Sequence, residues 1–429
     1  MKHSKYIIPY KEQDELYIYH QISESLLKVD ESLYNTLLED KITDLPEEFQ
    51  VILKEKGFII PQKMDESIFI KYGNLKTRYQ GDILRVTILP TLNCNFKCWY
   101  CYEQHYPSKL SEVGIIAIKT FIINEAIQKK IKRIELDWFG GEPLLYFDKI
   151  IFPISIEIKE WAKENEVQFV NMITTNGSLI TQERISLMNN INLRSFQITF
   201  DGDKEYHNKV RFSPKLVNSF DVILNNIHAL CRGIYDINMD VRINYTMENI
   251  NSIETLLDRF DKDIRKFISI SMHIVWQESE KIIDLSPKVQ KIKKLASDMG
   301  FKIPAIKSFN RKCTTCYTEN TEQFVINHDL NVYKCTARDF TGDFSIGKIL
   351  DNGSFMPNSL YFKYYTTSSP VLNDNCIQCD LLPSCLNSGS CLQKKIEGAE
   401  TKCFYKLIQK EVLNMVKRKI QQKPSSTQK

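Results

Sequence analysis

The sequence lacks the features that mark membrane, repetitive and secreted proteins. No stretch approaches the roughly 20 consecutive apolar residues that a membrane-spanning helix needs. There is no internal repeat, and the only low-complexity tract is the polar tail 421–429. Residues 1–11 carry lysines but no long apolar run with a small-residue cleavage site, so they do not read as a secretory signal. We therefore expect a soluble, cytoplasmic protein.

The chain also has no large excess of positive or negative charge. The formal net charge is only +4 over 429 residues, and the basic residues are interspersed with acidic ones. This pattern gives no reason to expect nucleic acid or a membrane surface as a partner. The balance of apolar and charged residues is typical of a globular chain long enough for two or three domains.

Cysteine, by contrast, is plentiful and unevenly placed. Of the 12 cysteines, three lie at 94–101, Cys231 stands alone, and eight lie at 313–403. In a reducing compartment disulfides are rare, and clustered thiols more often hold metal. The distribution predicts two metal-binding regions. Cys231 falls on a predicted helix, where we expect a buried, small apolar residue.

Between residues 83 and 276, short β-rich segments alternate with segments of helical periodicity, which is typical of βα units. The predicted strands cover 84–89, 134–139, 169–174, 195–200, 240–246 and 268–274. The predicted helices cover 112–128, 151–165, 181–188, 217–230 and 253–260. Six such units predict an α/β fold, a partial (β/α)6 TIM-like barrel. Ligands of parallel sheets bind beyond the C-terminal ends of the strands, so functional residues are expected there.

The segments outside the barrel have a different character. Residues 1–80 contain short β runs and two helical patterns, which predict a small winged-helix-like module; the pattern leaves open whether it recognises a peptide or caps the barrel. The barrel would occupy 81–300 and a cysteine-rich domain 301–410. Residues 411–429 would form a helix end and polar tail. A cysteine-dense region of this kind is expected to fold around its metals.

A loop of spacing C-x3-C-x2-C, formed by Cys94, Cys98 and Cys101, follows the first predicted barrel strand. Three thiolates can ligate three irons of a cubane cluster and leave the fourth iron open. An open iron can chelate the amino and carboxylate groups of S-adenosylmethionine, which then supplies radical chemistry. Zinc is the alternative, but structural zinc sites take four protein ligands, and no cysteine or histidine follows at finger spacing.

This loop resembles the signature of the radical S-adenosylmethionine (SAM) superfamily, including the aromatic residue before the last cysteine, here Tyr100. The resemblance implies that the turn Gly140, Gly141, Glu142 and Pro143 holds the methionyl amino group of the cofactor. Glycine suits such a turn because it lets the backbone approach a ligand closely.

Further cofactor contacts are expected just beyond the later strands. Related peptide-modifying enzymes have segments similar to those that contain Thr175, Asn176, Asp201 and Arg211, and place ribose and carboxylate contacts among them. Ordinary turn chemistry is the alternative for Asn176 and Asp201. Arg242, on the fifth strand, reaches the cofactor if its side chain faces inward.

The eight C-terminal cysteines resemble those of the SPASM domain, which binds two auxiliary [4Fe-4S] clusters in enzymes that mature peptides and proteins. The resemblance implies that Cys313, Cys316, Cys335 and Cys391 hold the first cluster, and that Cys376, Cys379, Cys385 and Cys403 hold the second. The five residues between Cys385 and Cys391 depart from the usual three. A zinc ribbon is the alternative for the C-x2-C pairs. Residues 324–335 predict a β-hairpin.

Together these resemblances imply an oxidoreductase that uses S-adenosylmethionine and three [4Fe-4S] clusters to generate a 5′-deoxyadenosyl radical. The N-terminal module resembles domains that bind leader peptides by strand addition. The first hypothesis is therefore oxidative modification, by crosslinking, of a ribosomally made peptide. The alternatives are an anaerobic sulfatase-maturating enzyme that makes formylglycine, and a non-catalytic iron–sulfur electron-transfer or binding protein. The expected partners are a peptide or protein substrate with a leader, and a one-electron reductant such as flavodoxin or ferredoxin. No acid–base catalytic residue is assigned.

Overall fold

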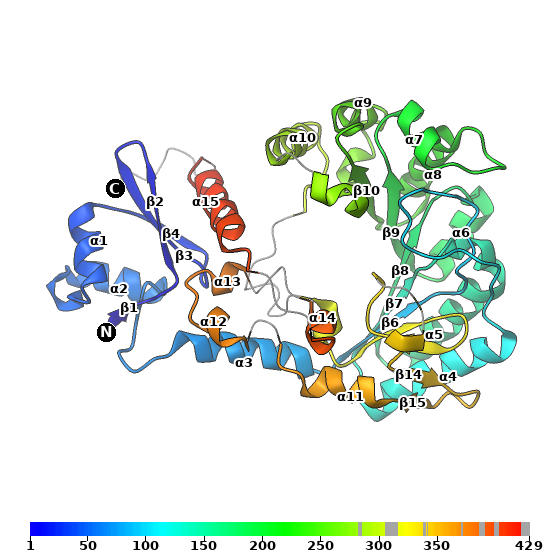
Figure 1. Cartoon of the computed structure of the whole chain (residues 1–429), viewed down its shortest axis with the longest axis horizontal. Coiled ribbons are helices and arrows are strands. Elements are labelled where there is room, and N and C mark those ends of the chain that lie inside the picture. Colours follow the sequence, from blue (N-terminus) through cyan, green and yellow to red (C-terminus); the bar gives the residue numbers. More distant parts are fainter. Residues whose placement is uncertain are drawn as a thin grey trace. The chain divides into compact units, whose positions relative to one another are not determined.

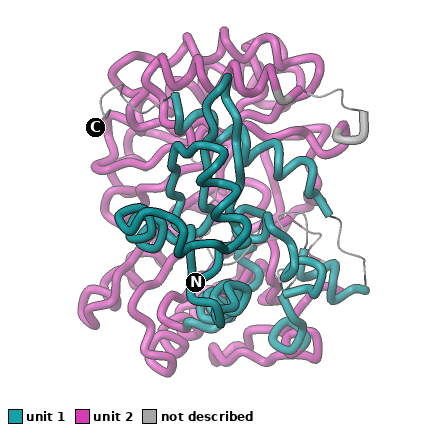
Figure 2. Tube along the Cα trace, turned by 90° about the vertical axis from the view of Figure 1, so that its left-hand side faces the viewer, with its two compact units in different colours: residues 1–80, 306–321, 363–429 teal, residues 81–305, 322–362 magenta. Residues whose placement is uncertain are grey.

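The computed structural model describes residues 1–281, 285–304, 316–337, 340, 342–369, 372–385, 391–398 and 403–421. Figure 2 shows that the chain forms two compact units. Unit 1 comprises residues 1–80, 306–321 and 363–429, and unit 2 comprises residues 81–305 and 322–362.

Unit 2 is built on a sheet whose strand order is β11-β10-β9-β8-β7-β6-β12-β13-β14-β15. Six strands run parallel in chain order, namely β6 (Ile83–Ile88), β7 (Arg133–Trp138), β8 (Gln168–Thr175), β9 (Leu193–Phe200), β10 (Asn238–Tyr245) and β11 (Ile268–Ile274). The prediction placed each within two residues at either end. β12 (Gln323–Ile326) extends the sheet beside β6 and forms an antiparallel hairpin with β13 (Asn331–Tyr333), as predicted. β14 (Gly347–Ile349) and β15 (Phe355–Pro357) complete the sheet.

Helices follow the strands and cover the outer side of the parallel sheet (Figure 1). They are α4 (Glu112–Gln128), α5 (Phe152–Glu164), α6 (Gln182–Asn190), α7 (Lys204–Val210), α8 (Ser219–Gly233), α9 (Ile253–Asp258) and α10 (Ser286–Asp298). Side chains of Ser111, Thr181 and Asp203 cap the starts of α4, α6 and α7 by accepting from backbone N–H groups. Unit 2 is thus an α/β fold with a parallel-rich sheet, consistent with the predicted partial barrel. Cys231 is buried on α8, as predicted.

Unit 1 contains a three-stranded antiparallel sheet of order β2-β3-β4. Its strands are β2 (Ile7–Glu12), β3 (Glu15–His20) and β4 (Ser25–Val29), and a further pair joins β1 (Lys2–His3) to β5 (Ile59–Ile60). The N-terminal helices are α1 (Glu31–Leu38), α2 (Glu47–Glu55) and α3 (Glu66–Tyr79). The C-terminal ones are α11 (Ser359–Thr366), α12 (Asp374–Ile377), α13 (Leu382–Cys385), α14 (Leu392–Ile396) and α15 (Tyr405–Gln421). Sequence patterns missed β4 and α3.

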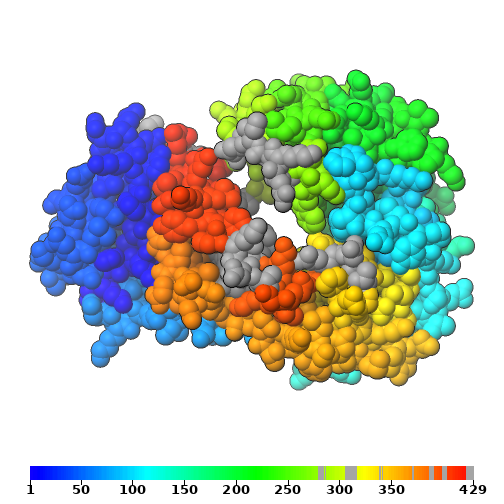
Figure 3. All heavy atoms as spheres, viewed as in Figure 1, coloured from blue at the N-terminus to red at the C-terminus, as the bar shows by residue number. Residues whose placement is uncertain are grey.

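The three-stranded sheet is buried on both faces. Leu16 and Ile18 of β3 pack on one side with residues of the α1 and α2 region, such as Leu37 and Leu53. Tyr19, on the same strand, faces the other side, where the packing partners come from α15 and the segment before α13. Figures 1 and 3 show the red C-terminal helix against the blue N-terminal strands. Residues 1–80 therefore share a core with the C-terminal segments. Their winged-helix identity stays a prediction.

None of the helices in the described part of the chain combines the length and the apolar composition needed to cross a membrane.

Candidate active site

A cavity of about 190 Å³ lies in unit 2, towards the C-terminal ends of strands β6 to β11, where the functional residues were expected. The predicted residues that line it are Cys94, Cys98, Cys101, Tyr100, Gly140, Gly141, Thr175, Asn176, Arg211 and Arg242. The predicted residues that do not line it are Glu142, Pro143 and Asp201. The structure therefore gathers residues from the six parallel strands, or from the segments that follow them, around one space.

The three loop cysteines have the chemistry of a cluster site. Burial raises the pKa of Cys94 to about 12, and it also raises the pKa values of Cys98 and Cys101. The Arg211 guanidinium acts in the opposite direction on all three thiols. Metal ligation requires the thiolate form, so a buried cation beside three partly buried thiols favours an anionic cluster over protonated cysteines. This donor set fits a cubane that is held by three cysteines.

The glycine turn packs tightly against the start of the cysteine loop. Gly140 and Gly141 have φ angles of +84° and +50°, in the left-handed region. A Cβ atom on Gly141 would lie 2.2 Å from the backbone oxygen of Asn93, so no larger residue fits there. The N–H of Glu142 donates to the same Asn93 oxygen at 2.8 Å. The turn thus places backbone atoms without side chains at the cavity wall.

Glu142 lies beneath that wall and is fully buried. Its Oε1 accepts from Thr175 Oγ1 at 2.7 Å and from the Leu144 N–H at 2.9 Å, and its Oε2 accepts from the Asn176 N–H at 2.7 Å. Both carboxylate oxygens are therefore engaged with the protein. Glu142 joins the turn after β7 to the end of β8.

Glu103 is a cavity residue that the sequence reasoning missed. Its Oε2 accepts from the Gly141 N–H at 2.7 Å, while its buried Oε1 has no hydrogen-bond partner in the described part of the chain. Burial raises the pKa of this carboxyl. Ligand atoms of Cys101, Glu103 and His105 lie within 4.8 Å of one another. The only signal in the sequence is an acidic residue two positions after the last loop cysteine.

A second buried network supports the floor of the site. The Tyr100 hydroxyl donates to Asp201 Oδ2, and Arg211 Nη1 donates to the Tyr100 oxygen at 3.0 Å. Arg211 also forms an ion pair with Asp201 at 3.9 Å. Burial raises the pKa of Asp201, and the Arg211 charge opposes that rise. The aromatic residue of the cysteine loop thereby connects the loop to the end of β9.

Arg242 faces the cavity from β10, as expected for an inward position on that strand. Its Nε donates to Asn244 Oδ1 at 3.0 Å, two residues along the same strand. Both side chains line the cavity, which agrees with the two-residue period of a strand.

Seven of the eight C-terminal cysteines are described, and Cys313 lies outside the described residues. Burial raises the pKa of Cys376, and the neighbouring Cys385 and Cys403 raise it further. Burial also raises the pKa of Cys379, on which Cys385 acts in the same direction. The four cysteines predicted for the second auxiliary cluster thus all belong to unit 1, and Cys385 acts electrostatically on both members of the C-x2-C pair. For the first cluster, Cys316 and Cys391 belong to unit 1 and Cys335 to unit 2, and that assignment stays a prediction.

Comparison with known proteins gives a consistent picture. Residues 88–260 match the model of the Radical SAM superfamily. The chain is 24% identical over 450 residues to the radical SAM cyclopropyl synthase TigE of Paramaledivibacter caminithermalis, covering 91% of this chain and 89% of that protein. It is 25% identical over 319 residues to a cysteine-type anaerobic sulfatase-maturating enzyme of Clostridium novyi, covering 68% and 84% respectively. Its fold is similar to that of native anSMEcpe with bound AdoMet and Cp18Cys peptide, with a TM-score of 0.60 at 16% identity over 79% of this chain and 99% of that one.

Proposed function

We propose that this chain, whose residues 88–260 match the model of the Radical SAM superfamily, oxidatively modifies a ribosomally made peptide with S-adenosylmethionine and three [4Fe-4S] clusters. The observation that carries the proposal is the cavity in which three partly buried thiols, a buried arginine and the Gly140–Gly141 backbone meet. When bound, the cofactor and its cluster supply the one-electron chemistry that removes a hydrogen atom from the substrate.

Different residues of the cavity would hold different parts of the cluster and its cofactor. Cys94, Cys98 and Cys101 would ligate three irons, and the Arg211 charge would stabilise the anionic cluster. The backbone of Gly140 and Gly141 would approach the amino-acid part of the cofactor. Thr175, Asn176 and Arg242 line the same cavity and would contact its remaining polar groups.

Glu103, and not Glu142, is the carboxylate that we assign to the cofactor's ammonium group. Both oxygens of Glu142 already accept hydrogen bonds from the protein. Glu103 lines the cavity and keeps one buried oxygen without a partner among the described residues. A buried acceptor without a donor is costly, and an ammonium group would satisfy it with a charge-assisted hydrogen bond. Glu142 would act indirectly, by fixing the turn.

The C-terminal cysteines would hold the two auxiliary clusters. The electrostatic effects of Cys385 and Cys403 on Cys376, and of Cys385 on Cys379, support the second of them, since four thiols are the usual ligand set of a cubane. A substrate radical must lose one more electron before an oxidised, closed-shell product forms. An auxiliary cluster offers an acceptor for that electron.

The N-terminal sheet would recognise the peptide. Among the described strands, β4 pairs only with β3, so one edge of β4 has free backbone groups that can accept another strand. The alignment with the cyclopropyl synthase covers 91% of this chain and therefore includes part of residues 1–80. The alignment with the sulfatase-maturating enzyme covers 68% of this chain, which does not require it to include any of residues 1–80. This difference favours a peptide maturase over a sulfatase-maturating enzyme.

Mass spectrometry of the product tests the proposal. The anaerobically prepared protein would be incubated with S-adenosylmethionine, a reductant and peptides encoded beside its gene. A peptide that loses two hydrogens and no longer fragments between two residues is the expected result. Loss of two hydrogens with normal fragmentation would indicate a ring within one residue. Conversion of a single cysteine or serine to an aldehyde would replace the proposal with the sulfatase-maturase alternative, and absence of 5′-deoxyadenosine would overturn the enzymatic function.

A further inference from the structure

The segment that carries Cys376, Cys379 and Cys385 packs directly on the N-terminal residues of unit 1. Tyr6 is fully buried and forms a small core with Ile70 and Leu382, against which Cys376 is packed. On the neighbouring part of the sheet, Cys379 and Cys385 pack against a core that includes Tyr19 of β3. The predicted ligands of the second auxiliary cluster therefore rest on residues more than 300 positions earlier in the chain.

Two side chains from the N-terminal residues hold the backbone of this segment. Lys5 Nζ donates to the backbone oxygen of Ile377 at 2.9 Å. Gln21 is buried, and its Nε2 donates to the backbone oxygen of Asp380 at 2.7 Å. Ile377 directly follows Cys376, and Asp380 directly follows Cys379. The two contacts thus bracket the C-x2-C pair.

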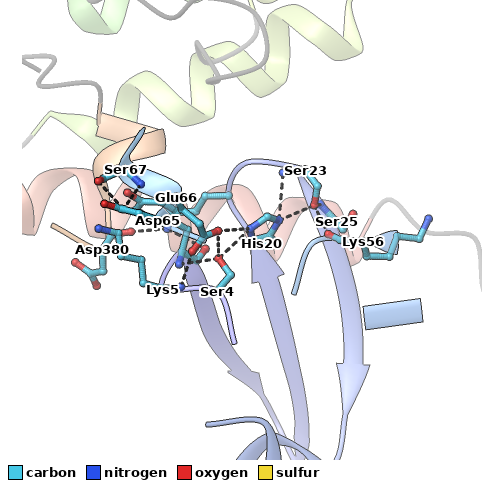
Figure 4. A network of polar contacts seen from close by, with 12 residues as sticks. Ser4, Lys5, His20, Ser23, Ser25, Lys56, Asp65, Glu66, Ser67 and Asp380 are labelled. Atoms are coloured by element: carbon cyan, nitrogen blue, oxygen red, sulfur yellow. Dashed lines mark hydrogen bonds and ion pairs between the residues drawn. The ribbon is translucent and has the colours of Figure 1, made fainter. Parts of the chain in front are cut away.

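A buried polar network fixes the position of Lys5 and Tyr6 in turn. Ser4 Oγ donates to Glu66 Oε1 at 2.6 Å, and the Lys5 N–H donates to Glu66 Oε2 at 3.0 Å. His20 Nε2 lies 3.1 Å from the same Ser4 Oγ. Figure 4 shows these side chains converging from β3 and from the start of α3. The start of the chain is therefore rigidly placed beside the cysteine segment.

The Tyr6 hydroxyl is the unexplained group in this arrangement. It is buried and has no hydrogen-bond partner in the described part of the chain. Tyr6 packs in the small core that Cys376 contacts, so its ring lies beside the segment of the C-x2-C pair. Buried hydroxyls in folded proteins almost always donate a hydrogen bond. A sulfur acceptor in this segment would supply the missing partner.

We propose that the N-terminal residues complete the site of the second auxiliary cluster: Tyr6 donates a hydrogen bond to a sulfur of the cluster beside the Cys376–Cys379 loop, and Lys5 and Gln21 position that loop. The inference rests on the auxiliary cluster of the proposed function. Hydrogen bonds to sulfur stabilise the reduced cluster and raise its reduction potential. Residues 1–80 thus tune the electron acceptor as well as recognising the peptide.

The substitution Tyr6→Phe tests the hydrogen bond, because it removes only the hydroxyl. Redox titration followed by electron paramagnetic resonance should show one of the three clusters shifted to a lower midpoint potential, with unchanged iron content. The exchangeable proton coupled to that cluster in electron-nuclear double resonance should disappear. Tyr19→Phe is the matched control for packing: Tyr19 is also buried and its core also contacts Cys379 and Cys385, but its hydroxyl is not among the buried groups without a hydrogen-bond partner. It should leave all three potentials unchanged.

The substitutions Lys5→Met and Gln21→Leu test the two loop contacts. Each should lower the iron content by up to about four of about twelve irons, while 5′-deoxyadenosine formation by the barrel continues. Lys11→Met is the control, because Lys11 is an exposed lysine of β2 that pairs with Glu31.

The outcomes separate this inference from the proposed function. A wild-type protein with only about four irons would overturn the auxiliary clusters, and the inference with them. Wild-type protein with about twelve irons, but with potentials and iron content insensitive to Tyr6→Phe, Lys5→Met and Gln21→Leu, would overturn the inference alone. Equal shifts in the Tyr6→Phe and Tyr19→Phe variants would assign the effect to general packing, and would also overturn it.

Discussion

The backbone N–H of Gly141 donates a hydrogen bond to Oε2 of Glu103 at 2.7 Å, and together with the bond from the Glu142 N–H to the Asn93 oxygen this contact joins the glycine turn to the cysteine loop. It also leaves the other oxygen of Glu103 buried at the cavity. Five predictions follow from the structure around it and from the rest of the chain.

Glu103→Gln should weaken binding of S-adenosylmethionine by about 10- to 100-fold, because a hydrogen bond to a charged group contributes about 1.5–3 kcal/mol. Equilibrium dialysis with the reconstituted protein measures this. An analogue without the amino group should bind wild type and variant equally. If the analogue loses affinity to the same extent, Glu103 does not contact the ammonium group.

Glu142→Gln should act mainly on stability. An amide cannot accept all three hydrogen bonds that the carboxylate accepts, so unfolding should become easier by about 1–3 kcal/mol. A denaturation midpoint measured anaerobically checks the loss. A cofactor affinity that falls more than in Glu103→Gln would reverse the roles assigned to the two glutamates.

Replacing Cys94, Cys98 and Cys101 together by alanine should remove about four of about twelve irons and abolish formation of 5′-deoxyadenosine. Iron analysis and chromatography of the reaction products measure both effects. Continued cofactor cleavage in this variant would refute the assignment of the loop. Cys231→Ser is the control and should keep full iron content, because Cys231 is buried on α8 away from the cysteine loop.

Gly141→Ala should disrupt the turn and abolish cofactor binding, because its Cβ would lie 2.2 Å from the Asn93 backbone oxygen at a φ of +50°. Gly342→Ala is the matched control, since no described atom lies within 4 Å of its added Cβ. Assays of S-adenosylmethionine binding to both variants provide the measurement. Normal cofactor affinity in Gly141→Ala would mean that the turn is not part of the binding site.

Proline substitutions at Leu26 and Leu27 test strand addition at β4. Successive N–H groups of an edge strand point alternately to its neighbour and outward. The substitution that removes the outward N–H should lower the affinity for the peptide and leave cofactor cleavage unchanged. The substitution that removes the N–H facing β3 should in addition destabilise the sheet. Fluorescence anisotropy with labelled peptide provides the measurement. Unchanged peptide affinity in both variants would exclude recognition at this edge.

Deleting residues 1–80 would be a poorer test of recognition. The deletion would remove Tyr6, Ile8 and Tyr19 from cores that they share with Leu381 and Leu382, so it would expose the cysteine segment as well as remove the sheet. Point substitutions separate these effects.

The sequence by itself determined the elements and chemistry that depend on local pattern. Alternation and helical periodicity placed β6 to β11 within two residues, because each barrel strand and helix buries a regular set of apolar positions. The spacing of Cys94, Cys98 and Cys101 pointed to a cluster because ligands on one short loop must meet. Helix α3 escaped detection because the face that it buries includes Asn74 and Arg78, and a polar buried face has no apolar period.

Only the tertiary structure decided which distant segments meet. Glu103 became a candidate because folding brings its carboxylate to Gly141, and Glu142 became a support because β8 supplies its hydrogen-bond donors. The N- and C-terminal segments joined in one unit because the three-stranded sheet has two apolar faces and the first eighty residues cover only one. Such contacts depend on which surfaces remain unburied after local structure forms, and no local pattern records that.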